Sequence, residues 1–277
     1  MITLREIETA ISNDREIGDG DVAVLTPKKE LSSVLWEDGE LKSGLREVLY
    51  KIGLEFYLTL GVDAPIKDIT VTGSLANYNY TPYSDVDLHV LLDYRVVDED
   101  FDFVLDYMNA KKSVWNEKHN IKIKGHDVEL YAQDINEPHH STGVYSIMAN
   151  KWITKPVPKK AQVDLPEVRK KAAALMKQID DVLSEESPSL KKIDALKDKI
   201  RKMRQSGLET SGEYSVENLA FKVLRNTDYI KRLYDRSVEE FDKSLTIETE
   251  GINKQEVLYR NILNRLIEVQ DKWKSTK

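Results

Sequence analysis

The chain contains no cysteine, few glycines and prolines, and no long apolar run. Without cysteine it forms neither disulfides nor thiolate metal sites, so carboxylate or imidazole groups must hold any metal, which favours hard cations. No stretch approaches the roughly 18 apolar residues that span a bilayer, and the amino terminus carries acids in place of a signal-length apolar core. We therefore expect a cytoplasmic protein without a membrane segment.

Charge is unevenly distributed along the 277 residues, although the formal total is only −7. Residues 1–150 hold 14 Lys and Arg against 27 Asp and Glu, whereas residues 151–277 hold 27 against 21. The acidic total argues against broad, salt-driven coating of nucleic acid, and we find no DNA-specific motif. An acidic half suits cations, and a basic half suits phosphates.

The hydrophobic pattern predicts two domains. Residues 1–158 mix helical periodicity with short β-rich runs, which indicates an α/β or α+β domain. Three prolines in residues 151–166 predict the boundary, and the rest of the chain is helical in pattern. We place the second domain at 159–277. The expected helices are 3–13, 41–62, 101–118, 165–185, 189–206, 215–236 and 253–275, and the expected strands are 66–73, 86–94, 121–124 and 127–133.

One run combines a glycine, serines and two aspartates at strand ends. Gly73 and Ser74 end a β-branched strand, and after ten residues of turn and short helix Asp85 and Asp87 open another. Side chains alternate across a strand, so the two carboxylates point to the same face and can share cations. Two divalent ions about 4 Å apart steady the attacking and leaving oxygens of an in-line displacement. This pattern predicts a site for two Mg²⁺ ions, with Mn²⁺ as a substitute.

Three residues beside the acid pair are candidate phosphate ligands. Gly73 has no Cβ, so backbone can approach a phosphate there, and Ser74 offers a hydroxyl and an amide at an expected helix start. Ser84, directly before the acid pair, completes the predicted nucleotide-binding set. His89 shares the face of the acids, and we expect it to pack beneath them without a catalytic role.

A third carboxylate must bind the catalytic metal or take the proton of the attacking hydroxyl. The strand HDVELYAQ supplies Asp127 and Glu129 on one face. We favour Glu129, because it sits between Val128 and Leu130 as expected of a sheet residue that projects into a site. Asp127 follows a Gly-His turn, where solvent is the expected partner.

Gly-Ser, ten residues and then DVDLHV resemble the signature of the DNA polymerase beta-like nucleotidyltransferase superfamily. The resemblance implies a small mixed sheet with acids on neighbouring strands and flanking helices, an α+β fold, followed by a helical domain. It also implies magnesium and an NTP donor, with ATP expected. Predicted bacteriophage nucleotidyltransferases share runs similar to TGSLANYNYTPYSDVDLHV, GVYSIMANKWI and GEYSVENLAFKVLRN, a likeness over most of residues 30–235 that would place the protein in a host cytoplasm.

The basic half offers two further candidates. Lys222 and Arg225 lie off the apolar stripe of their helix, either as a solvated face or as phosphate ligands like the lysines in the helical domain of related enzymes. The run 191–205 has seven basic and two acidic residues, so it either borders a groove for an anionic acceptor or forms an exposed face. It lacks the aromatic residues of a stacking platform.

Three functions are compatible with these residues. The leading hypothesis is transfer of AMP from ATP to a hydroxyl on an RNA 3′ end, a small molecule or a protein, with release of pyrophosphate. A nucleotide-binding or partner-binding protein without turnover is the alternative. A glycosyltransferase that uses Asp-x-Asp explains less, because Gly73, Ser74 and the later acidic strand would be coincidences. No P-loop or protein-kinase motif occurs.

Overall fold

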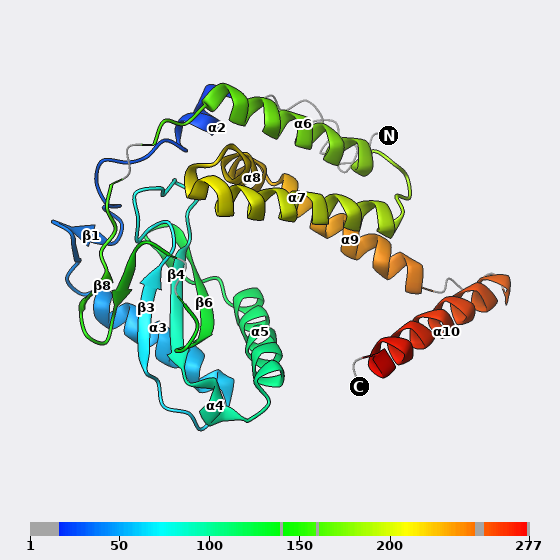
Figure 1. The fold of residues 1–277 in the computed structure, drawn as a ribbon, viewed down its shortest axis with the longest axis horizontal. Helices are drawn as coiled ribbons and strands as arrows, with labels where there is room; N and C mark the ends of the chain where they lie inside the picture. The colour runs from blue at the N-terminus through cyan, green and yellow to red at the C-terminus, as the bar shows by residue number, and fades with distance from the viewer. Residues whose placement is uncertain (1–16, 139–140, 159–160, 247–251, 276–277) are drawn as a thin grey trace, which may run out of the picture. The chain divides into compact units, whose positions relative to one another are not determined.

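The computed structural model describes residues 17–138, 141–158, 161–246 and 252–275 (Figure 1). Its described residues form two compact units, one from Gly18 to Leu165 and one from Pro166 onward. The domain boundary expected after residue 158 stays a prediction, and the helix expected at 3–13 lies outside the described residues.

A six-stranded mixed sheet organises the first unit, in the order β5-β6-β4-β3-β7-β8. The pairs β3·β4, β3·β7, β5·β6 and β7·β8 are antiparallel, whereas β4 and β6 are parallel. Sheet and helices together confirm the expected α+β class. The strands are β3 (Asp68–Thr72), β4 (Val86–Leu92), β5 (Lys122–Ile123), β6 (His126–Asp134), β7 (Val144–Ser146) and β8 (Lys151–Thr154).

The two faces of the sheet differ in polarity because side chains alternate along each strand. Val86, Leu88 and Val90 of β4 are fully buried on one face, in a core that includes residues of α3 (Leu45–Leu60) and α5 (Phe101–Lys118). Figure 1 shows these two helices beside the sheet. The alternate positions of β4 and β6 carry polar side chains on the opposite face. The predicted site therefore lies on the face turned away from this core.

β5 pairs only with His126 and Asp127 of β6, and α5 partly covers the edge of β6 beyond them. The Asn116 side chain of that helix donates to the Leu130 carbonyl (3.0 Å) and accepts from its amide (3.0 Å). These bonds satisfy backbone groups that an edge strand would otherwise expose. The helix predicted at 101–118 is confirmed with the same bounds.

Short elements complete the first unit: α2 (Asp19–Ala23), the hairpin β1 (Trp36–Glu37) and β2 (Glu40–Leu41), and α4 (Tyr94–Val97). The Trp36 ring stacks on Trp152, with centroids 4.4 Å apart, and packs edge-on against the fully buried Tyr145. This aromatic cluster joins the hairpin to the β7–β8 edge of the sheet.

The described part of the second unit is helical: α6 (Leu165–Leu183), α7 (Leu190–Ser211), the 3₁₀ turn Gly212–Tyr214, α8 (Val216–Asn226), α9 (Tyr229–Leu245) and α10 (Ile252–Ser275). The prediction of one continuous helix at 215–236 is wrong, because the helix is interrupted between α8 and α9. Asp228 has a φ of 63°, and the Thr227 hydroxyl donates back to the Val223 carbonyl (2.8 Å). Among the described helices, none has the length and apolarity to cross a membrane.

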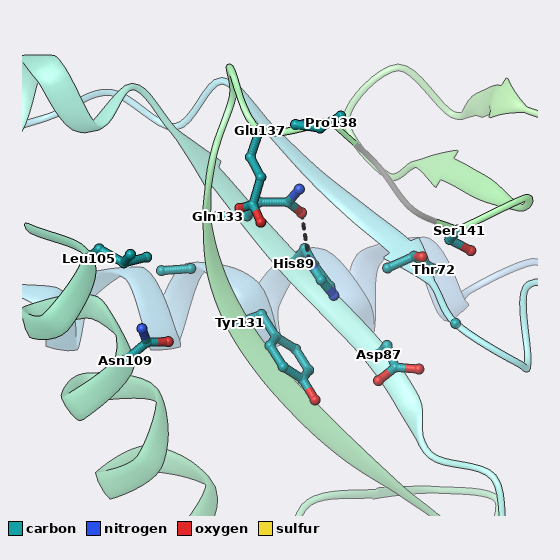
Figure 2. Close-up of a pocket in the computed structure, with 12 residues that line it drawn as sticks. Thr72, Asp87, His89, Leu105, Asn109, Tyr131, Gln133, Glu137, Pro138 and Ser141 are labelled. Carbon is teal, nitrogen blue, oxygen red and sulfur yellow. Dashed lines mark hydrogen bonds between the residues drawn. The ribbon is translucent and has the colours of Figure 1, made fainter. Parts of the chain in front are cut away.

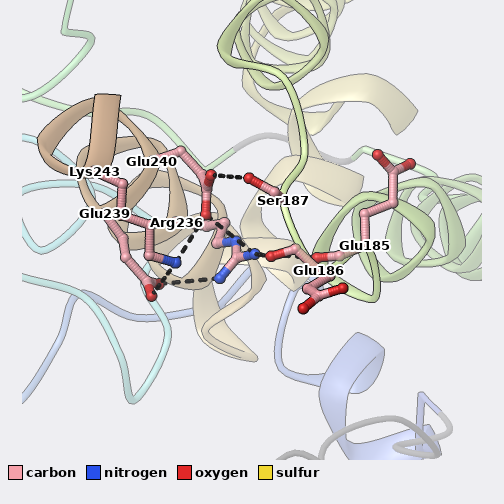
Figure 3. A network of polar contacts seen from close by, with 7 residues as sticks. All are labelled: Glu185, Glu186, Ser187, Arg236, Glu239, Glu240 and Lys243. Atoms are coloured by element: carbon pink, nitrogen blue, oxygen red, sulfur yellow. Dashed lines mark hydrogen bonds and ion pairs between the residues drawn. The ribbon is translucent and has the colours of Figure 1, made fainter. Parts of the chain in front are cut away.

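A polar network ties α9 to the loop that joins α6 and α7 (Figure 3). Arg236 donates to the carbonyls of Glu185 (3.0 Å) and Glu186 (2.7 Å) and pairs with Glu240 (3.2 Å). The Ser187 hydroxyl donates to Glu240 as well (3.0 Å). These contacts hold the α6–α7 turn against α9, which gives them a structural role.

Candidate active site

Strand register brings the predicted acids together on the polar face of the sheet. Asp87 on β4 is the register partner of Glu129 on β6 and, on its other side, of Thr72 on β3. Asp85 directly precedes β4, two positions before Asp87, and both aspartates are half-buried. The three carboxylates expected from the sequence therefore lie on neighbouring strands. Their catalytic role stays a prediction.

Gly73 and Asp87 are interlocked. Gly73 has a φ of +73°, and a Cβ built on it would lie only 1.7 Å from Asp87 Oδ2. The sequence suggested that the missing Cβ lets backbone approach a phosphate; in the structure the same space receives the Asp87 carboxylate. Glycine is thus required at this position by backbone conformation and by the acid beside it.

The loop between β3 and β4 differs from the expectation. Residues 73–76 form a turn and not the start of a helix, so Ser74 does not lie at a helix N-terminus. The Ser74 hydroxyl donates to Ser84 Oγ (2.8 Å), which also accepts from the Thr81 amide (2.9 Å). Ser84 is 2% exposed, so it supports the loop that presents Ser74, and direct contact of Ser84 with a nucleotide stays a prediction.

Tyr131 holds the third carboxylate. Its hydroxyl donates to Glu129 Oε2 at 2.5 Å. Burial raises the pKa of Tyr131 well above its ordinary value, and the negative charges of Glu129, Asp87 and Asp85 raise it further. The phenol therefore stays protonated and remains a donor. All three carboxylates therefore lie close enough to Tyr131 to act on its hydroxyl.

Asp127 has a different environment from Glu129. It is exposed at the start of β6 and forms an ion pair with Lys122 of β5. Its carboxylate is thereby engaged at the edge of the sheet, whereas that of Glu129 lies next to Asp87 through the strand register. These contacts favour Glu129 as the third carboxylate.

The chemistry of this donor set fits magnesium. Carboxylate oxygens are the ligands that Mg²⁺ prefers, and it is usually bound by one or two of them together with substrate phosphates and water. Within the described ranges, no group of three or more His, Asp or Glu residues is arranged so that it could hold a metal ion. Substrate phosphates and water would have to supply further oxygen ligands beside the carboxylates.

A hollow of about 530 Å³ extends from Asp87 along the polar face (Figure 2), whereas Asp85 and Glu129 line a separate hollow of about 370 Å³. Within the larger hollow, His89 Nδ1 lies 2.7 Å from Gln133 Oε1, and the His89 ring stacks on Tyr131 with centroids 4.6 Å apart. The Lys112 ammonium lies 4.0 Å from the centre of the Tyr131 ring. The other polar side chains that line the larger hollow, apart from Asp87 and Glu137, are those of Thr72, His89, Asn109, Tyr131, Gln133 and Ser141.

Most of these lining residues were not expected from the sequence. His89 lies on the acid face as expected, but its ring lines the hollow and does not pack beneath the acids. Glu129, Tyr131 and Gln133 occupy alternate positions of one strand, a period-2 polar pattern that was visible in the sequence. Asn109 had no such signal, because it comes from α5.

Lys222 and Arg225 lie on α8 in the helical unit. Burial lowers the pKa of Lys222 to about 8, and the nearby charges of Arg225 and Arg204 act in the same direction. A cluster of cations with a destabilised ammonium suits an anionic ligand. Their contact with the triphosphate stays a prediction.

The basic run 191–205 acquires aromatic neighbours only in the folded unit. Arg204 of α7 lies 4.4 Å from the centre of the Phe221 ring of α8, and Lys197 lies 4.7 Å from that of Tyr234 of α9. The run also contains intrahelical ion pairs, such as that of Arg201 with Asp198. Both the exposed face and the groove remain compatible with these contacts.

Residues 54–151 match the family model described as "Nucleotidyltransferase domain". The matched segment contains Gly73, Asp85, Asp87 and Glu129, and the match supports the nucleotidyltransferase superfamily expected from the sequence. The match supports transfer of a nucleoside monophosphate from an NTP.

Other comparisons add little. No curated protein matches the chain. A solved structure, the STING-associated CdnE c-di-GMP synthase from Capnocytophaga granulosa, is 14% identical over 86% of this chain and 94% of its own, with a TM-score of 0.20. That score is too low to carry an argument. The resemblance to bacteriophage nucleotidyltransferases stays a prediction.

Proposed function

We propose that the protein transfers AMP from ATP to a hydroxyl of an acceptor, with Mg²⁺ as cofactor and pyrophosphate as the second product. One observation carries the proposal: Asp87 stands between Gly73 and Glu129 on the polar face of the sheet, in a segment that matches a nucleotidyltransferase domain. In the proposal, the backbone at Gly73 binds phosphate on one side of Asp87, and Glu129 on the other side is the third carboxylate.

The chemistry follows from this order. The acceptor oxygen forms a bond to the α-phosphorus, and the bond from that phosphorus to the oxygen bridging to the β-phosphate breaks. Glu129 takes the hydroxyl proton, and Tyr131 keeps its carboxylate oriented by donating to Oε2. Mg²⁺ held by Asp85, Asp87 and Glu129 would neutralise charge on the triphosphate and on the leaving pyrophosphate.

The phosphates have two proposed sets of ligands. The backbone at Gly73 and the hydroxyl of Ser74 approach the β and γ phosphates from the loop after β3, with Ser84 holding that loop. Lys222 and Arg225 of α8 contribute positive charge. Deprotonation of Lys222 near pH 8 would weaken this contribution.

The experiment uses α-labelled ATP, Mg²⁺ and a cell extract, followed by separation of RNA, protein and small molecules. Asp85→Ala and Asp87→Ala abolish labelling of the acceptor but leave the fold intact, because the acids repel each other until metal binds. Asp63→Ala, at an exposed aspartate before β3, is the matched control and retains activity. If a variant that carries both Asp85→Ala and Asp87→Ala still labels the acceptor, the assignment of these acids to the active site is refuted.

A binding experiment separates turnover from recognition. Calorimetry with a non-hydrolysable ATP analogue shows heat of binding for the wild-type chain, and the heat decreases when Mg²⁺ is chelated. If the analogue binds but no NTP yields labelled product or pyrophosphate, the chain is a nucleotide-binding protein without turnover, and the proposed function fails.

A further inference from the structure

The hollow beside Asp87 lies where the proposed function needs an acceptor to enter. In an in-line displacement the incoming oxygen approaches opposite the leaving pyrophosphate. The proposed triphosphate site is at Gly73 and Ser74 on the β3 side, so the acceptor comes from the β6 side. The hollow reaches from Gly73 and Asp87 across to Tyr131 and Gln133 of β6, which covers that approach.

The walls of the hollow are rich in hydrogen-bonding groups (Figure 2). Gln133 is only 8% exposed, and its amide oxygen lies at 2.7 Å from His89 Nδ1. The imidazole is fixed in turn by stacking on Tyr131. Asn109 on α5 faces these groups across the hollow. Such an arrangement suits a ligand with several hydroxyl or amino groups, because each group finds a donor or acceptor.

Charge decides between the classes of acceptor. Asp87 and Glu137 line the hollow, and among the described residues lining it none is lysine or arginine; Lys112 contacts the Tyr131 ring but is not one of them. Glu129, next to Asp87 in the register, adds another negative charge nearby. A phosphorylated acceptor would bring its anionic groups among these carboxylates, whereas proteins that hold a nucleic-acid backbone supply Lys and Arg.

We infer that this hollow is the acceptor site and takes a small, hydroxyl-bearing molecule without phosphate or other acidic groups, in preference to an RNA 3′ end. Its volume of about 530 Å³ lies within the range of small-molecule sites. The inference rests on the proposed function and names the acceptor class for the same site.

The test divides one cell extract into four acceptor pools before the reaction. The pools are RNA, protein, small molecules retained by an anion-exchange resin, and small molecules that pass through it. The full chain is incubated with each pool, α-labelled ATP and Mg²⁺, and we expect labelled product from the pool that passes through. Label confined to any of the other three pools overturns the inference while the proposed function stands. No label in any pool refutes the proposed function and the inference with it.

A variant locates the acceptor in the hollow. Asn109 is exposed, so Asn109→Leu removes its amide without disturbing the core. Loss of one hydrogen bond raises the pool concentration for half-maximal rate by about 2- to 12-fold, with the KM for ATP unchanged. Ser113→Leu, at an exposed position one turn later on α5, removes only a hydroxyl that donates to the Asn109 backbone carbonyl (2.9 Å); it is the control and changes neither value. An unchanged half-maximal concentration in Asn109→Leu contradicts the placement.

Discussion

Replacing Gly73 by alanine tests the interlock between that residue and Asp87. The φ of +73° strains any residue with a Cβ, at a cost of about 1–2 kcal/mol. The new Cβ would start 1.7 Å from Asp87 Oδ2, so the carboxylate must move by about 1.3 Å to reach a 3.0 Å contact. A misplacement of about 1 Å in a catalytic group costs roughly 100-fold in rate, so we expect transfer to fall by at least that factor.

The assay compares initial rates of AMP transfer and thermal unfolding for two glycine variants. Gly44, before α3, has a φ of +81° and open space where a Cβ would be, so Gly44→Ala imposes the strain without the clash. Gly44→Ala loses stability from the strain alone and Gly73→Ala loses at least as much, but only Gly73→Ala loses activity. The reasoning is refuted if Gly73→Ala keeps a rate within twofold of wild type.

Three further predictions concern single side chains. Tyr131→Phe removes the hydrogen bond to the charged Glu129, about 1.5–3 kcal/mol, and lowers the initial rate about 10- to 100-fold; a rate equal to wild type would mean that Glu129 needs no support. Ser84→Ala deprives the Ser74 hydroxyl of its acceptor and lowers the free energy of unfolding by about 1–3 kcal/mol in a denaturant titration, whereas no change would show that the loop does not depend on this bond. The folded pKa of Lys222, about 8, lies below its ordinary 10.5, so its charge opposes folding at pH 7 and stability recovers as pH rises from about 8 to about 10.5. Lys222→Met therefore raises the melting temperature at pH 7, and a stability difference from wild type that fails to shrink over this range would contradict the assignment.

The sequence was most informative where local periodicity decides the structure. Asp85 and Asp87 could be assigned to one face because alternation within a strand is local. Their relation to Glu129 could be suggested but not established, since the parallel pairing of β4 with β6 depends on the packing of the helices between them. The contact of Gly73 with Asp87 could not be predicted from the sequence either, because it depends on the pairing of β3 with β4.

The helical half shows where periodicity misleads. The apolar spacing ran through residues 215–236 as though one helix were present, but Asp228 adopts a left-handed conformation and separates α8 from α9. Aspartate tolerates that conformation better than most residues, and the sequence alone did not reveal its use here. Phe221 and Tyr234 lie near the basic side chains of α7 for a related reason, since only packing brings three helices together.

The parallel pairing of β4 and β6 also determines when the site can exist during folding. Asp87 and Glu129 are 42 positions apart, and the chain between them contains α4 and α5. Closing such a loop costs entropy that only the completed pairing recovers. A ribosome-bound chain that ends before β6 would hold Gly73 and the acid pair but lack the third carboxylate, so the nascent protein gains its reaction centre only after β6 is synthesised.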